Sequence, residues 1–154
     1  MNYPDCPDPN SFENGLEFQD YVIDALRGLG IIVQTYASKS YQYRKGESAQ
    51  GVEIKLDSRC TETGRLSIEI AEKTTDLNKP WIPSGIYRSD NTWLYVQGNR
   101  HIVFVFPKNV LLMLHKSGKY EEAETLTVKK FYLPMKLAER YAAKVLRHKD
   151  NSAN

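Results

Sequence analysis

The sequence is poor in the features that mark disulfide scaffolds, secreted proteins and membrane proteins. Its two cysteines, Cys6 and Cys60, lie far apart and do not form a paired metal-ligand motif. The longest apolar run, "NVLLMLHKSG", is far too short to span a bilayer, and the start "MNYPDCPDPN" is too acidic and proline-rich for a signal sequence. We therefore expect reduced thiols in a soluble cytoplasmic protein that makes no membrane contact.

A strong charge of one sign is also absent. The 21 basic and 19 acidic residues give a net charge of +2, which is too small to identify a partner. The sequence has no glycine-rich phosphate loop and no Ser-His-Asp signature, and its histidines (His101, His115 and His148) are scattered without a metal-ligand pattern. These absences argue against a P-loop enzyme, a serine hydrolase and a zinc site.

The hydrophobic pattern predicts one α/β domain spanning residues 1–154, with a mixed central β-sheet flanked by helices. Residues 1–12 are expected to form a loose N-terminal arm and residues 149–154 a polar tail. Helices are expected over 14–29, 107–115 and "PMKLAERYAAKVLRH", with a helical turn near 84–89. Strands are expected within 31–44 and over 52–57, 66–72, "TWLYV", 102–106 and 126–133.

The segment "GVEIKLDSRCTETGRLSIEIAEK" predicts two strands joined by a polar turn at Gly64. Side chains alternate across a strand, so the charged set Glu53, Lys55 and Asp57 lies opposite the apolar residues. In the second strand, Glu69 lies opposite its apolar neighbours. If the strands pair as a hairpin, with opposite Cβ atoms about 5 Å apart, Asp57 and Glu69 approach one point.

Clustered carboxylates repel one another, so such a face needs a cation. Lys55 supplies one, and carboxylates with water ligands suit Mg²⁺ or Mn²⁺. On spacing alone, a solvent-exposed strand face with weak ion pairs is the favoured reading. Two features shift the balance toward a metal site: the apolar surroundings of Glu69 in "LSIEIA" and the loop "PSGIYRSDNTW" that follows.

The ordered set "GVEIKLD", a "TG" turn, "IEIAEK" and "SGI…W" resembles the phage and bacterial branch of the PD-(D/E)XK nuclease superfamily. The resemblance covers Glu17 to about Leu133. It implies a restriction-endonuclease-like core, a PD-(D/E)XK-type endodeoxyribonuclease activity, a Mg²⁺ (or Mn²⁺) cofactor with no small-molecule cofactor, and DNA as the partner.

The resemblance also implies roles for individual residues. Asp57 and Glu69 match metal ligands, and Glu17 matches a helix acid that assists the metal. The family lysine is expected at position 71, where this chain has Ala71, so Lys55 is the candidate for its catalytic role. Alternative site residues in the same segment are Glu53, Glu72 and Lys73.

The candidate nucleic-acid contacts lie in two other segments. Ser84 and Arg88 belong to the loop after the charged segment, where Arg88 is a phosphate partner or a solvated loop arginine. The run "YASKSYQYRK" interleaves aromatic and basic residues in a pattern that suits a phosphate backbone and stacked bases, but also an ordinary exposed strand. Its candidates are Lys39, Tyr43, Arg44 and Lys45.

Three other functions are compatible with the sequence. A nucleic-acid-binding protein that does not cut is favoured by Ala71. A structural or protein-interaction domain is the alternative in which the acids only aid solubility. A Holliday junction resolvase is favoured if the protein is a symmetric homodimer.

Overall fold

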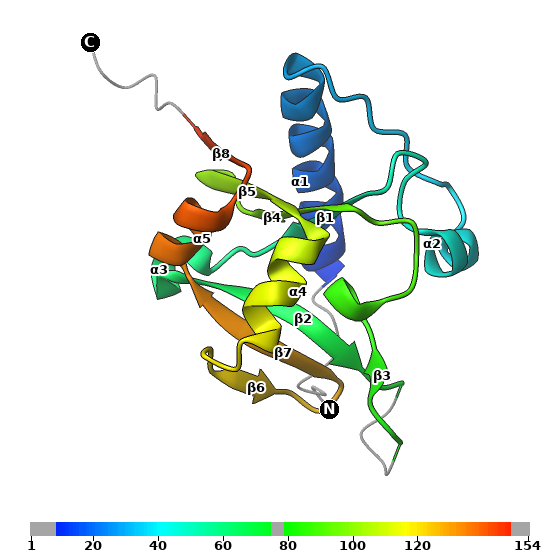
Figure 1. The fold of residues 1–154 in the computed structure, drawn as a ribbon. Helices are drawn as coiled ribbons and strands as arrows, with labels where there is room; N and C mark the ends of the chain where they lie inside the picture. The colour runs from blue at the N-terminus through cyan, green and yellow to red at the C-terminus, as the bar shows by residue number, and fades with distance from the viewer. Residues whose placement is uncertain (1–8, 75–78, 149–154) are drawn as a thin grey trace.

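The structure is a computed structural model that describes residues 9–74 and 79–148. Eight strands form two four-stranded sheets (Figure 1). The first sheet has the order β1 (Val52–Leu56), β4 (Leu94–Gly98), β5 (Ile102–Pro107) and β8 (Lys144–Arg147). The second has the order β3 (Ile82–Pro83), β2 (Arg65–Glu72), β7 (Val128–Pro134) and β6 (Glu122–Glu124).

The first sheet is mixed, because β1 runs parallel to β4 while the other neighbours are antiparallel. Helix α1 (Pro9–Gly28) covers one of its faces. Val22 and Leu26 recur at helical spacing and pack on alternate strand residues such as Val96 and Val105. We call this cluster the α1 core.

A second cluster, the inter-sheet core, lies on the other face of the first sheet. Here Phe104 and Phe106 of β5 meet Ile68 of β2 and Phe131 of β7, together with helices α4 (Lys108–Lys116) and α5 (Met135–Tyr141). Strand β5 therefore contributes to both cores through alternate side chains. None of the helices within residues 9–74 and 79–148 combines the length and the apolar character needed to cross a membrane.

The predicted α/β class is confirmed, but the strands are divided between two sheets instead of forming one central sheet. The predicted hairpin of residues 52–57 and 66–72 is wrong. Both segments are strands, yet they belong to different sheets. Helix α3 (Cys60–Thr63) joins them, and Gly64 ends it at a φ of 74°, where glycine is favoured. This connection turns β2 away from β1, so β1 pairs with β4 instead.

Three element boundaries also differ from prediction. Helix α1 begins at Pro9, inside the expected arm. The segment expected as a strand within 31–44 ends in helix α2 (Lys39–Lys45), which starts at the Ser38 cap. The last predicted helix stops at Tyr141, and β8 follows because Val145 and Leu146 pair with β5. The 3₁₀ turn η1 (Gly85–Tyr87) lies where a helical turn was expected. The tail 149–154 and Cys6 lie outside the described residues.

Candidate functional site

Lys55, Asp57 and Glu69 line one open cavity of about 420 Å³, although their strands do not pair. We call it the carboxylate cavity. Strand β4 adds Tyr95 and Gln97 to its wall, because Lys55 lies beside Gln97 in the parallel register. The remaining wall comes from the segment after β1 and from the strands β2 and β7, with Arg59, Arg65, Ser67, Lys130 and Tyr132 among its residues.

Asp57 is held rigidly at the point where three strands meet. Its Oδ2 accepts hydrogen bonds from the backbone N–H of Ser67, at 2.8 Å, and from Nε2 of Gln97, at 3.0 Å. The same Gln97 nitrogen lies 2.7 Å from the carbonyl oxygen of Ser67, to which it also donates. One carboxylate oxygen thereby fixes the orientation of Asp57 between β1, β2 and β4.

Glu69 lies on the face of β2 turned away from the inter-sheet core, opposite Lys130 in the register with β7. Its side chain is half-buried. Within the described part of the chain, no hydrogen bond or ion pair engages its carboxylate. Both of its oxygens are thus available to a ligand in the cavity.

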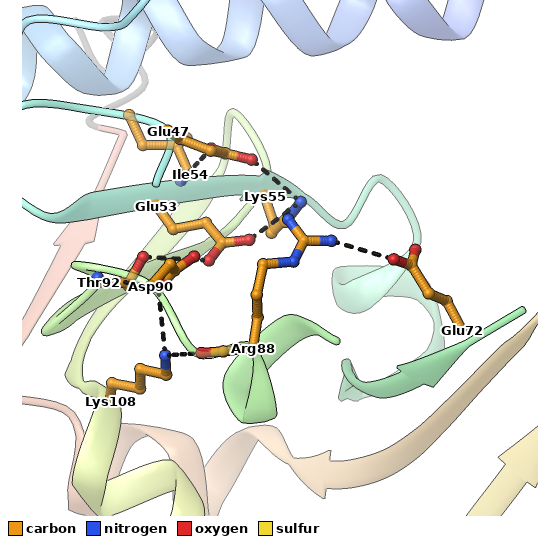
Figure 2. Close-up of polar contacts among 9 residues, drawn as sticks. All are labelled: Glu47, Glu53, Ile54, Lys55, Glu72, Arg88, Asp90, Thr92 and Lys108. Atoms are coloured by element: carbon orange, nitrogen blue, oxygen red, sulfur yellow. Dashed lines mark hydrogen bonds and ion pairs between the residues drawn. The ribbon is translucent and has the colours of Figure 1, made fainter. Parts of the chain in front are cut away.

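Lys55 places a positive charge beside Asp57 and Glu69 in the carboxylate cavity. Its Nζ lies 3.2 Å from Oε1 of Glu47 and 3.2 Å from Oε1 of Glu53 (Figure 2). Burial acts to lower the pKa of Lys55, but the carboxylates of Glu53, Glu47 and Glu69 outweigh it and raise the pKa above its ordinary value. Lys55 is therefore an ammonium ion throughout the neutral range.

Glu53, the alternative central acid, is buried and only 1% exposed. Burial raises its pKa from 4.5 to about 7, against the opposing charge of Lys55. Its Oε2 accepts a 3.5 Å hydrogen bond from the hydroxyl of Thr92. Glu53 contacts Lys55 through the ion pair described above. It is not among the residues that line the carboxylate cavity.

Arg88 and Glu72 are partly buried and belong to the same network of charged and polar side chains (Figure 2). Nη2 of Arg88 lies 3.3 Å from Oε1 of Glu72, and the backbone oxygen of Arg88 accepts a 2.7 Å hydrogen bond from Lys108. Lys108 also pairs with Asp90 at 3.4 Å. Arg88 therefore has an ion-pair partner in Glu72, and its role as a phosphate partner stays a prediction.

Glu17 is not brought to the cavity. It lies on α1, pairs with Arg100 at 2.7 Å, and lines a neighbouring cavity of about 290 Å³ that shares Leu56 and Ser58 with the carboxylate cavity. Among the described residues, no group of three or more His, Cys, Asp or Glu side chains could hold a metal ion. The expected three-acid set is thus reduced to two acids, Asp57 and Glu69.

Two carboxylates fit a magnesium ion that keeps several waters and takes further oxygens from a phosphate substrate. Asp57 has one oxygen committed to its neighbours, and Glu69 has none. The hydroxyl of Tyr95, fully buried in the wall, has no hydrogen-bond partner in the described part of the chain.

The remaining predicted contact residues, and the alternative site residue Lys73, fall into three places. Ser84 is buried, and its N–H donates to the carbonyl of Ile70 at 3.2 Å. Lys39, Tyr43, Arg44 and Lys45 lie on α2, where Lys39 lines a second cavity of about 430 Å³. That cavity shares Lys55 and Leu56 with the carboxylate cavity. Lys73 lies 4.4 Å from the ring centre of Trp81.

The cavity wall also contains charged, amide and aromatic residues that were not predicted, among them Arg59, Arg65, Gln97, Lys130 and Tyr132. Arg59 lies in the connection after β1 and Arg65 at the start of β2, while the other three lie on strands that pair with β1 and β2 across long stretches of sequence. Alternation within β7 groups Lys130 with Tyr132, but only the pairing of β2 with β7 shows that they face Glu69.

The chain matches no protein-family model, and no curated protein or solved structure is significantly similar to it. The nuclease resemblance therefore rests on the motifs of the sequence alone.

Proposed function

We propose that this protein is a metal-dependent nuclease that hydrolyses DNA phosphodiester bonds in the carboxylate cavity. The observation that carries the proposal is that Lys55, Asp57 and Glu69 line one open cavity with Arg59, Arg65 and Lys130. Acids that can hold a hard cation thus lie beside bases that can bind a polyanion. We place this activity in the cytoplasm, where Cys60 stays a thiol. The resemblance is also compatible with a phage-encoded protein.

Asp57 and Glu69 would hold Mg²⁺ or Mn²⁺, which when bound supplies Lewis-acid polarisation of the phosphate and an acidified water. Gln97 and the Ser67 N–H keep Asp57 in one orientation. Lys55 cannot act as a general base near neutral pH, because its neighbours raise its pKa. Its role is to stabilise the negative charge that builds up on the phosphate.

The test is cleavage of plasmid and single-stranded DNA with Mg²⁺ or Mn²⁺. We expect Glu69→Ala and the isosteric Glu69→Gln to abolish cleavage, since either change removes a carboxylate that faces the cavity. Glu139→Gln is the matched control, because Glu139 is an exposed acid that pairs with Arg147 and does not line the cavity. Equal cleavage by wild type and Glu69→Gln, or no cleavage by either, would sink the hydrolytic proposal.

The second candidate is a nucleic-acid-binding protein that does not cut. It is favoured by Ala71 and by the position of Glu17, which pairs with Arg100 and does not line the carboxylate cavity. It predicts retention of DNA that weakens steeply with salt and no cleavage under any metal condition. A Holliday junction resolvase, in contrast, predicts a homodimer in light scattering and a preference for four-way junctions.

A further inference from the structure

The carboxylate cavity has a second side that phosphate hydrolysis alone does not use. Across from Asp57, β7 places Tyr132 and Lys130 on the face that carries Arg65 and Glu69 of β2. The guanidinium carbon of Arg65 lies 3.6 Å from the centre of the Tyr132 ring, and Nζ of Lys130 lies 5.7 Å from that centre. We call Arg65, Lys130 and Tyr132 the stacking wall.

The stacking wall is held loosely enough to accept a ligand. The Arg65 side chain is 40% exposed, and its ion pair with Glu121 is long at 3.8 Å. An exposed ion pair of this kind contributes little to stability. The guanidinium group over the phenol ring therefore forms a cationic, aromatic surface next to the acids.

The size of the cavity also points to more than a phosphate. A volume of about 420 Å³ falls in the range that holds a small organic ligand. Unpaired bases bind to protein by stacking on aromatic rings and on guanidinium planes.

We propose that the stacking wall is a subsite for an unpaired nucleobase, so that the cavity takes single-stranded DNA. This inference rests on the proposed function, because it assumes that the phosphate of the DNA lies at Lys55. The base stacks on Arg65 and Tyr132, while Lys130 faces the adjacent phosphate. A duplex would have to unstack a base to occupy this subsite, so the single strand is the preferred substrate.

The experiment measures binding of oligonucleotides that carry one 2-aminopurine, in EDTA so that no cleavage occurs. We expect single-stranded DNA to bind the full-length protein more tightly than the same sequence as a duplex, with fluorescence quenched by stacking. Tyr132→Leu and Arg65→Lys should each weaken single-strand binding by about tenfold, because they remove a planar surface.

The salt dependence separates stacking from phosphate contact. Both substitutions preserve the charge at their position, so the slope of log affinity against log salt should stay unchanged. Arg140→Lys is the matched control, since Arg140 also lies over a tyrosine ring, at 5.6 Å from Tyr141, but does not line the cavity. It should bind like wild type, and circular dichroism should show all variants folded.

Equal affinity for single strand and duplex, unchanged binding by both wall variants, or a reduced salt slope in Tyr132→Leu would overturn the base subsite. Failure of the proposed function gives a different result. In that case the wall variants lose binding in EDTA as expected, while wild type cuts no DNA when Mg²⁺ or Mn²⁺ is restored.

Discussion

At the scale of single residues, the most unusual group is the buried carboxyl of Glu53. Its pKa of about 7 in the folded state exceeds the ordinary 4.5, so the folded protein binds more protons than the unfolded chain between these values. Stability linked to Glu53 is therefore fully present below pH 4.5 and is lost as the pH rises toward 7. Above this pH range, the free energy of unfolding is lower by about 3 kcal/mol.

Glu53→Gln should remove this dependence, because an amide does not ionise. Relative to wild type, the variant should gain up to about 3 kcal/mol in free energy of unfolding between pH 5 and pH 8. Urea denaturation at both pH values measures the difference, and the exposed Glu62→Gln serves as control. A constant difference at the two pH values would mean that Glu53 is ionised throughout.

Gln97 is a positioning residue, because it acts on the cavity through Asp57 and Ser67. Gln97→Leu cannot donate to Asp57, so the carboxylate loses one of the two hydrogen bonds that fix its orientation. We expect the Mg²⁺ concentration for half-maximal cleavage to rise at least several-fold. A merely structural role would lower stability but leave that concentration unchanged, and Gln50→Leu, at an exposed position, controls for the loss of an amide side chain.

At the scale of elements, η1 is pressed against the backbone of β2 at Gly85. A Cβ atom there would lie 2.1 Å from the carbonyl oxygen of Glu69, and the φ of Gly85 is +55°. Gly118 has a similar φ of +70° but open space around it. The two glycines therefore separate backbone strain from steric contact.

Gly85→Ala should lower the free energy of unfolding by about 2–5 kcal/mol, because the φ angle is strained and the new Cβ forces η1 away from β2. Gly118→Ala should cost only about 1–2 kcal/mol, because it meets the strain alone. Thermal or urea unfolding measures both. The Gly85 variant should also lose cleavage, since its displacement disturbs Glu69; full activity would contradict the tight coupling of η1 to the site.

The strands and helices differ in how well the sequence pattern predicts them. Alternation placed Lys55 and Asp57 on one face of their strand, and Glu69 opposite its apolar neighbours, as the structure has them. It failed for α2, where tyrosines with high strand propensity lie on a short capped helix. It also failed at β8, whose strand state depends on pairing with β5, a distant segment.

At the scale of the whole molecule, the two cores are coupled through β5. Leu26 belongs to the α1 core and Leu133 to the inter-sheet core, and both are fully buried. Because β5 contributes to both clusters, neither core can lose its packing without exposing the other. We expect one cooperative unfolding transition.

Leu26→Ala and Leu133→Ala should each lower the free energy of unfolding by about 2–5 kcal/mol while leaving the urea m-value unchanged. Leu29→Ala, at a position that is 46% exposed, should have a much smaller effect. Circular dichroism and tryptophan fluorescence should give coincident curves. Two separated transitions in either core variant would show that the cores unfold independently.

The division of the strands between two sheets has a consequence for synthesis on the ribosome. Strand β1 can pair only after β4 has been synthesised, and β2 can pair with β7 only after β7 has been synthesised. The second edge of β5 pairs only with the later strand β8. Long-range pairing of this kind folds slowly, because chain closure precedes the stabilising contacts. A nascent chain that ends before β7 exposes the apolar face of β2, so such intermediates are natural clients for chaperones.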